Sequence, residues 1–476
     1  MHGSRCDDRS VRPHDRAQLR RTFQGAIITP ADPTYDEARR LWNAMLDRRP
    51  AVILRPTSSV DVAAAIAFAR ERDLVIAVRS GGHSVAGVVG PDGGLVIDLS
   101  AMQDVVVDPE RRAARVGGGT LLGALDAAAQ AHGLVCPVGV VGHTGVAGLT
   151  LGGGVGRLQR QFGLTIDNLV AVELVTADGR IVRASEAEEP ELFWGLRGAG
   201  WNFGIATAFD FRLQPFGPNL HRGIRIHPAT QAHEVWAVFR DYAASAPDAV
   251  SVIFGIDRAG PTVEVPDALT GRAIVYTAYN HSGAATDVER DTAGLRAGPA
   301  PVSETSGSQS YLEVQGAHDL ALGWGRRSHV LGTNGHGLRP EAIDALVELV
   351  ATAPGEGSFS VTALGGSIAR VPEDATAYAG RAAAFDLNAD MAWTDPAFDA
   401  ACRSWTEHVM AAVAADAAPG RYANGISAAG PAETRTIYGE AHLARLADLK
   451  RTWDPDNIFR LNHNVLPAAR DRAPTR

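Results

Sequence analysis

Short apolar runs and Ala-rich segments of helical period alternate along the first 215 residues. Residues 58–72 show helical periodicity, and Ser58 or Ser59 is suited to cap the start of that helix. Each apolar run is four to eight residues long and ends near Gly, Pro, Ser or Asp, which favours strands. The pattern therefore predicts an alternation of strands and helices, with further helices at 35–43 and 121–130 and strands at 50–56, 74–79, 95–99, 112–117, 169–175, 180–183 and 206–213.

The pattern changes at Pro215-Phe-Gly-Pro218. Beyond it the pattern of strands and helices is less regular, and the simplest packing for them is a sheet with helices on one side. The tail contains a helix and then a polar stretch, while residues 1 to about 20 are charged and expected to be disordered. In this second region we expect strands at 223–226, 250–256, 273–279, 359–364 and 384–392, and helices at 232–244, 340–353 and 396–415.

Charge and cysteine usage exclude several classes of protein. The net charge of −9 argues against a nucleic-acid partner or an anionic membrane surface. None of the three cysteines has a C-x-x-C neighbour, and His329 and His336 lack carboxylates at ligand spacing, so no metal is expected. The uncharged stretch 133–156 is long enough for a membrane span but contains nine glycines, which disfavours one. With no apolar leader visible, we expect a cytoplasmic protein.

Glycine makes up 51 of the 476 residues and is concentrated in three clusters, at 79–87, 139–156 and 196–204. Glycine lets the backbone turn tightly and approach a ligand, and successive N–H groups can converge on an anion. Taken singly, each cluster could equally be an ordinary turn. The second lacks the spacing and context of a dinucleotide fingerprint, and no Gly-Lys-Ser/Thr follows any of them, which excludes a P-loop. Three clusters on one side of Pro215 favour one extended cofactor.

The order of these motifs resembles the berberine bridge enzyme-like flavin oxidases of the vanillyl-alcohol oxidase, or PCMH, superfamily, and most closely their bacterial branch. The resemblance covers roughly residues 35–467. It rests on six motifs in sequence: Arg79-Ser-Gly-Gly-His83, Thr144 to Gly154, Gly163 to Asn168, Leu192 to Gly198, Asn202-Phe-Gly204 and Asn462-His-Asn464.

The resemblance implies an α+β fold with a PCMH-type FAD-binding domain and an antiparallel-sheet substrate domain. The boundaries would be an N-terminal extension at 1–34, the FAD domain at 35–217, the substrate domain at 218–430 and a segment at 431–476 that returns to the FAD domain. It further implies FAD bonded covalently to His83. The cofactor contacts would come from Arg79, Ser80, Gly81, Gly82, His83, Ser84, Gly87, Val140, Thr144, Gly145, Gly148, Gly153, Gly154, Gly156, Gly204, Ile205, Asn462 and Asn464.

Several positions depart from the family pattern. Relatives with a second flavin link have a cysteine where this chain has Val141, and Cys136 lies five residues earlier, so we expect the single link through His83 and a packing role for Cys136. A tyrosine that some relatives use as base is replaced by Gly425. Trp201 stands where bacterial relatives usually have glycine and narrows the site. Thr144 occupies the position that gates oxygen, and its small size suits an oxidase.

The segment Phe385 to Trp393 carries the best candidates for the reacting groups. Asp386, Asn388 and Asp390 alternate with apolar residues, so a strand would place all three on one face. A solvated outer face explains the alternation equally well. In the family the corresponding strand faces the flavin, which makes Asp390 our first candidate base, with Asn388 orienting substrate. Tyr422 is a further candidate, as are Tyr378 and Tyr311, for which packing roles are at least as plausible.

The sequence thus predicts an oxidase with covalent FAD that takes hydride from a C–H next to an alcohol or amine. The substrate would be a sugar or secondary metabolite, and molecular oxygen would become hydrogen peroxide. Two alternatives stay open: a dehydrogenase on the same scaffold with another electron acceptor, and a protein that binds flavin or ligand without turnover. The sequence identifies neither the substrate nor the oligomeric state.

Overall fold

The computed structural model describes residues 11–87, 90–260 and 265–469. Its first sheet has the order β1-β2-β4-β3, with β2, β4 and β3 parallel and β1 antiparallel. Helix α3 (Ser59–Glu71) links β2 to β3, and the Ser58 hydroxyl caps it by accepting the Asp61 N–H at 3.2 Å, as the sequence predicted. The strands are β1 (Ala26–Ile28), β2 (Val52–Arg55), β3 (Ile76–Arg79) and β4 (Leu95–Asp98).

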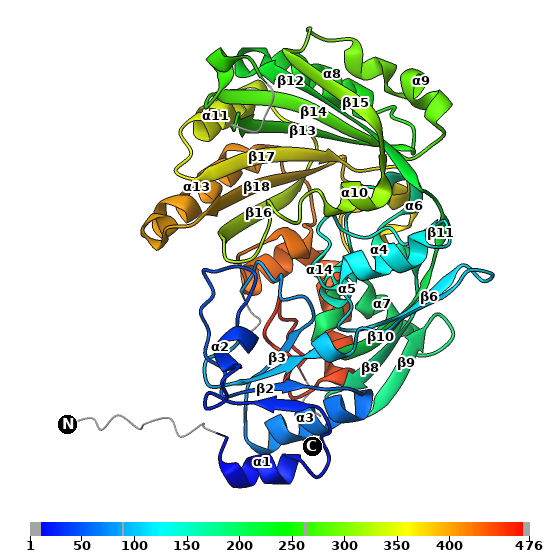
Figure 1. The fold of residues 1–476 in the computed structure, drawn as a ribbon, viewed down its shortest axis with the longest axis vertical. Coiled ribbons are helices and arrows are strands. Elements are labelled where there is room, and N and C mark those ends of the chain that lie inside the picture. Colours follow the sequence, from blue (N-terminus) through cyan, green and yellow to red (C-terminus); the bar gives the residue numbers. More distant parts are fainter. Residues whose placement is uncertain (1–10, 88–89, 261–264, 470–476) are drawn as a thin grey trace, which may run out of the picture.

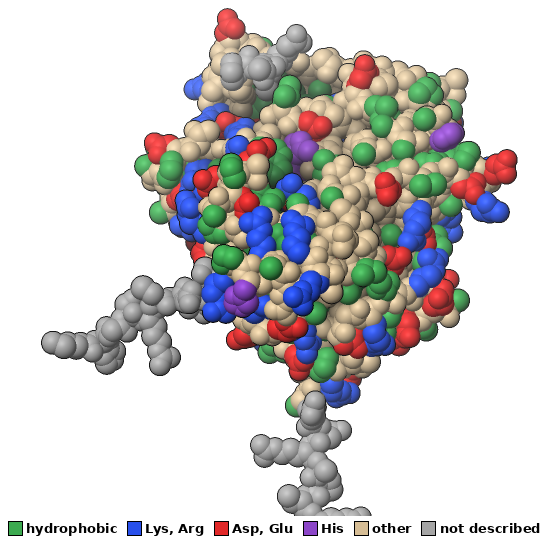
Figure 2. All heavy atoms as spheres, turned by 60° about the horizontal axis from the view of Figure 1, so that its bottom comes forward, with side chains coloured by type: hydrophobic (Ala, Val, Ile, Leu, Met, Phe, Trp, Pro, Cys, Tyr) green, Lys and Arg blue, Asp and Glu red, His purple; other side chains and the backbone are tan. Residues whose placement is uncertain are grey.

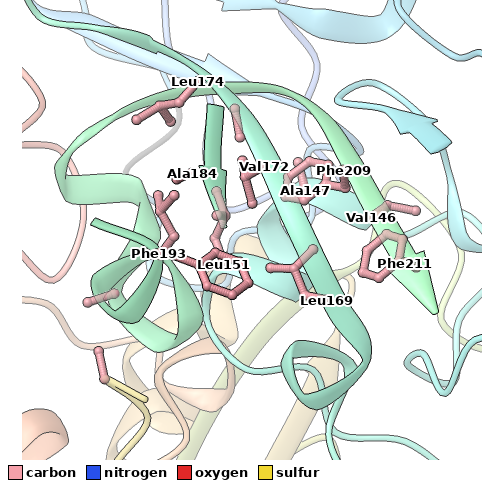
Figure 3. Close-up of a cluster of buried hydrophobic side chains, with 14 of the residues drawn as sticks. Val146, Ala147, Leu151, Leu169, Val172, Leu174, Ala184, Phe193, Phe209 and Phe211 are labelled. Carbon is pink, nitrogen blue, oxygen red and sulfur yellow. The ribbon is translucent and has the colours of Figure 1, made fainter. Parts of the chain in front are cut away.

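The second sheet is antiparallel and has the order β5-β6-β10-β8-β9. Helices α5 (Val146–Leu151) and α7 (Pro190–Ala199) cover it, and Figure 3 shows their apolar side chains, among them Val146, Leu151 and Phe193, in one cluster with Phe209 and Phe211 from β10. This packing anchors the second glycine cluster, because α5 lies within it. The strands are β5 (Val105–Asp108), β6 (Ala113–Gly117), β8 (Leu169–Thr176), β9 (Ile181–Ser185) and β10 (Gly204–Arg212), while β7 (Leu134–Val135) pairs with β11 (Gln214–Pro215).

A seven-stranded antiparallel sheet, β15-β12-β14-β13-β17-β18-β16, forms the upper half of Figure 1. Helices α8 (Ala232–Ala243), α11 (Pro340–Ala351) and α13 (Asp399–Ala412) pack on one face through a shared core, so the predicted α+β class with helices on one side is confirmed. The strands are β12 (Asn219–Pro228), β13 (Val250–Arg258), β14 (Ala273–His281), β15 (Ser303–Ser310), β16 (Arg327–Gly335), β17 (Glu356–Ala363) and β18 (Phe385–Trp393).

The chain then returns to the lower half of Figure 1 through α14 (Pro431–Trp453), which packs on α7. The segment that follows α14 runs beside the first two sheets, as its red colour shows in Figure 1. The remaining helices are α1 (Pro13–Leu19), α2 (Tyr35–Ala38), α4 (Leu122–Gln130), α6 (Gln159–Phe162), α9 (Val288–Thr292), α10 (Tyr311–Gly316) and α12 (Ser367–Arg370).

Several elements differ from the sequence prediction. Helix α1 lies within the first 20 residues, which were expected to be disordered, because Leu19 packs into the core of the first sheet. The short elements β1, β5, α5, α6, α7, α9, α10 and α12 were not predicted. The helix expected over 35–43 is only one turn, α2, and the chain beyond it is irregular. Strands β15 and β16 were not predicted. They are the two edges of the large sheet, and β15 is mostly exposed, so it lacks the apolar alternation of a half-buried strand.

Candidate active site

A cavity of 380 Å³ lies where the glycine clusters meet. The end of β3 and its following turn, the segment 139–148, the start of β10 and the C-terminal segment 459–463 line it. Segments far apart in the sequence are thus brought together as predicted. The predicted cofactor residues in its wall are Arg79, Ser80, Gly81, Gly82, His83, Ser84, Val140, Thr144, Gly145, Gly148, Gly204, Ile205 and Asn462, and Tyr422 joins them.

Five other predicted cofactor residues do not line the cavity: Gly87, Gly153, Gly154, Gly156 and Asn464. Packing explains all four of these glycines. A Cβ at Gly156 would collide with the Val138 carbonyl oxygen. A Cβ at Gly87 would lie 2.6 Å from Leu46, one at Gly153 would lie 2.7 Å from Tyr378, and one at Gly154 would collide with Thr165.

Sequence reasoning missed several lining residues. Trp42, Leu322, Phe459 and Leu461 come from three different loops, the last two from the segment after α14, and belong to no glycine cluster. His463 lies inside the Asn462-His-Asn464 motif, yet it lines the cavity where the neighbouring Asn464 does not. The sequence motif could have indicated His463, because Asn462 and Asn464 on either side of it were predicted to contact the cofactor. Isolated apolar residues in loops give no such sequence signal.

Two features of the wall fit a closely bound cofactor. A Cβ added to Gly148 would meet no protein atom within 4 Å, so the protein's own packing does not require glycine there. The Ser80 hydroxyl is buried and has no hydrogen-bond partner among the described residues. Buried polar atoms are usually paired, so Ser80 is available to a polar ligand. The backbones of Gly81 and Gly145 also pack directly together, which brings the first two clusters into one wall.

Arg79 is held by protein groups. Its guanidinium donates to the Asp98 carboxylate at 2.6 Å and to the Ala38 carbonyl at 2.5 Å, and Arg55 donates to the same carboxylate at 2.8 Å. Burial would raise the pKa of Asp98, but the two guanidinium groups hold it below its ordinary value. Arg79 therefore fixes the end of β3, and it shares the single negative charge of Asp98 with Arg55.

His83 lines the cavity, and its ring lies against Trp42, His143 and Trp324. Its Nε2 is 2.6 Å from Nδ1 of His143, and its ring stacks on Trp42 with centroids 4.9 Å apart. Burial, reinforced by the neighbouring His143, lowers the pKa of His83 to about 3, so the imidazole is neutral at physiological pH. Trp324 approaches the same ring edge-on at 6.3 Å.

The polar face of β18 looks away from the helices. Phe385, Leu387 and Ala389 fill the helix-side core, whereas Asp386 is buried on the opposite face and accepts a hydrogen bond from Asn388 at 2.9 Å. Asp390 is partly buried on that face. Burial raises the pKa of both Asp386 and Asp390 to about 6. Neither carboxylate has an ion-pair partner among the described residues, so this face is not an ordinary solvated surface.

Tyr422 lines the cavity, whereas Asp386, Asn388 and Asp390 do not. Its hydroxyl accepts hydrogen bonds from the Val155 N–H at 3.3 Å and the Asn424 amide at 3.1 Å. Burial raises its pKa, with Asp386 contributing in the same direction. Asn388 is also near, because a Cβ at Gly425 would lie 3.5 Å from its Oδ1. The missing tyrosine at position 425 therefore leaves space beside Asn388.

The C-terminal wall is held by Lys450, the single lysine of the sequence. Its fully buried ammonium donates to Asp454 at 2.6 Å, to the Asn202 carbonyl at 2.7 Å and to the Phe459 carbonyl at 2.8 Å. These bonds join the segment before β10 to the segment after α14, both of which reach the cavity.

Cys136 is fully buried in the core beside the second sheet and is not in the cavity wall. Burial raises the pKa of its thiol well above the ordinary value. No group of His, Cys, Asp and Glu that could hold a metal occurs among the described residues. None of the described helices is long and apolar enough to cross a membrane. Figure 2 shows basic and acidic side chains interspersed on the face that it presents.

These features define a flavoprotein of the PCMH type, and comparison with known proteins agrees. Residues 50–185 match the FAD binding domain family, and residues 425–466 match the berberine and berberine-like family. The chain is 30% identical over 501 residues to the FAD-linked oxidoreductase pgmH of Aspergillus terreus, which covers 98% of each chain.

Two solved structures share the architecture. The 6-hydroxy-D-nicotine oxidase of Arthrobacter nicotinovorans has a TM-score of 0.83 at 29% identity, covering 94% of this chain and 98% of that chain. The carbohydrate oxidase of Microdochium nivale has a TM-score of 0.83 at 23% identity, covering 96% and 100%, which shows a likeness of fold alone. The chain belongs to the berberine bridge enzyme-like family and is an FAD-linked oxidoreductase.

Proposed function

We propose that this oxidoreductase is an oxidase that holds FAD covalently through His83. It takes hydride from a C–H next to an alcohol or amine of a sugar or secondary metabolite and reduces molecular oxygen to hydrogen peroxide. The observation that carries the proposal is the neutral His83 imidazole in the wall of a glycine-lined cavity. When bound, the flavin supplies the hydride acceptor, and the chain supplies orientation and the acceptor for the substrate proton.

In this proposal Ser80 and the glycine turn after β3 hold the diphosphate, while the segment 139–148 lines the flavin ring. Gly148 allows close approach, and the unpaired Ser80 hydroxyl gains a partner. Arg79 acts by fixing the end of β3 through Asp98. Asn462 approaches from the C-terminal segment that Lys450 holds in place.

Asp390 is the proposed proton acceptor, with Asn388 orienting the substrate. The raised pKa of Asp390 suits a base that works near neutrality. Asp386 is a second candidate, because it lies beside Tyr378 and Tyr422 and one of its carboxylate oxygens is buried without a partner. Replacing each in turn separates them: Asp390→Asn should slow flavin reduction by about 10²-fold, the usual size of a general-base contribution. Near-normal reduction in that variant, with slow reduction in Asp386→Asn, would assign the base to Asp386.

Tyr422 acts as a hydrogen-bond donor in this scheme. Its oxygen already accepts two hydrogen bonds and its pKa is raised, so the phenol keeps its proton. That proton is free to hold a substrate oxygen or nitrogen. Tyr422→Phe should weaken substrate binding more than it slows the reduction step, which a titration of the reduction rate against substrate concentration measures.

The experiment that tests the proposal is a screen of sugars, alcohols and amines monitored by peroxide release, followed by stopped-flow reoxidation. An oxidase reoxidises rapidly in air, whereas a reduced flavin that persists in air indicates a dehydrogenase with another acceptor. If no compound bleaches the flavin anaerobically, the binding protein without turnover is the better account.

A further inference from the structure

The neighbours of His83 fix the position of every proton on its ring. The backbone carbonyl of Asp319 lies 3.2 Å from Nε2 of His143. A carbonyl oxygen can only accept, so Nε2 of His143 carries a proton, and in the form of that ring with a single proton its Nδ1 is bare. Bare Nδ1 lies 2.6 Å from Nε2 of His83, which must therefore be the donor. Neutral His83 has one proton, so its Nδ1 presents a free lone pair.

The loop between α10 and β16, residues 317–326, holds this chain of hydrogen bonds together. The Asp319 carboxylate accepts the Gly142 N–H at 2.7 Å, next to His143. The Leu322 carbonyl accepts the indole N–H of Trp42 at 2.6 Å, and Trp42 stacks on His83. The loop thus fixes His143 from one side and the plane of the His83 ring from the other, although it belongs to the sheet region and not to the glycine clusters.

We propose that His143 and the 317–326 loop prepare His83 for attachment of the flavin. In this inference, which rests on the proposed function, His143 accepts the proton that His83 loses from Nε2 as Nδ1 forms its new bond. His143 acts through His83 and is therefore a positioning residue that also receives a proton.

The step balances with dioxygen as oxidant. A C–H bond of a flavin ring methyl group and the Nε2–H bond of His83 break, and a bond forms between Nδ1 and the methyl carbon. The proton from His83 passes to His143, and the electron pair of the C–H bond is taken up by the isoalloxazine ring system. The methyl proton is released to solvent. Dioxygen then removes the electron pair together with two protons, which correspond to the methyl proton and the proton held by His143, as hydrogen peroxide. An Nδ1 atom without a proton has a free lone pair and can attack the methyl carbon directly. In the other tautomer Nδ1 carries the proton and has no lone pair for the attack.

The test follows covalent attachment directly and does not depend on turnover. Full-length apo protein from riboflavin-starved cells is mixed with saturating FAD in air, and the covalent fraction is followed by intact mass. Tight binding of FAD is measured separately by fluorescence quenching, which also reports that each variant is folded. The variants are His143→Ala, His143→Asn and, as a matched control, His132→Ala, whose side chain is exposed.

We expect His143→Ala to bind FAD but attach it about 10²-fold more slowly, the lower end of a typical proton-transfer contribution. His143→Asn should recover part of the rate, because its amide oxygen accepts the Nε2–H but cannot take the proton. His132→Ala should match the wild type. Wild-type rates in both His143 variants would overturn the relay. If His143→Ala does not fold, a wild-type rate in His143→Asn overturns it and a slowed rate supports it. No adduct in the wild type would instead reject the covalent link of the proposed function.

Discussion

Removing the charge of Lys450 tests whether its three bonds hold the C-terminal wall of the cavity. Methionine has a similar length and no charge, so Lys450→Met keeps most of the packing. It leaves the fully buried Asp454 carboxylate without a cation, although the Ile458 and Phe459 N–H groups still donate to it at 2.9 and 3.0 Å. It also removes the donor to the Asn202 and Phe459 carbonyls.

Breaking a buried ion pair from one side costs about 3–5 kcal/mol. With an unfolding entropy of roughly 2.1 cal/mol/K per residue, a chain of this length that unfolds as one unit would lose roughly 3–5 °C of Tm. Because the two freed carbonyls belong to segments that reach the cavity, non-covalent FAD affinity should fall as well. Scanning calorimetry and FAD titration measure the two effects.

The double variant Lys450→Met, Asp454→Leu is the control. It removes the stranded carboxylate, so it should recover part of the lost stability, since a buried pair can often be replaced by apolar residues. An unchanged Tm and FAD affinity in Lys450→Met would refute the reasoning that this lysine joins the two segments.

Three further predictions follow from buried groups. Burial raises the pKa of Asp126 to about 7, so the protonated carboxyl contributes about 4 kcal/mol to the free energy of unfolding, fully below about pH 4 and no longer once the pH has risen through 7. Asp126→Asn should flatten that part of the curve of Tm against pH, and parallel curves for variant and wild type would contradict the prediction. Because Asp390 must be ionised to accept a proton, flavin reduction should rise with pH around 6, and a rate independent of pH from 5 to 8 would exclude both β18 carboxylates. Cys136→Ala should lose about 1 kcal/mol of stability while intact mass still shows one attached FAD, and loss of attachment would mean that the thiol bonds the cofactor.

Much of the fold could be predicted because strands with an apolar face leave a strong sequence signal. Strands β2, β3, β4 and β18 and helix α3 lie where the pattern placed them. The two edge strands of the large sheet were not predicted, because an exposed edge strand such as β15 needs no alternation of apolar and polar residues. The short α2 was overestimated, since helical periodicity alone does not specify where a helix ends.

The parts of the site that are built from glycine-rich segments could be predicted from the sequence. The parts that depend on the direction of a single side chain could not. The clusters at 79–87 and 139–156 pointed to one cavity, because several glycines in one segment imply close backbone approach. The direction of Arg79 toward Asp98 could not be read from the chain, since a sequence position does not show where a long side chain turns. The relay from His143 to Asp319 joins residues 176 positions apart and has no local signal.

The most direct test of the account is the intact mass of the wild-type protein expressed with riboflavin in excess, read together with the colour of its acid precipitate. The account predicts a mass increased by one FAD, a yellow pellet, and loss of both in His83→Ala. A wild-type protein with the mass of the bare polypeptide and a colourless pellet would contradict it.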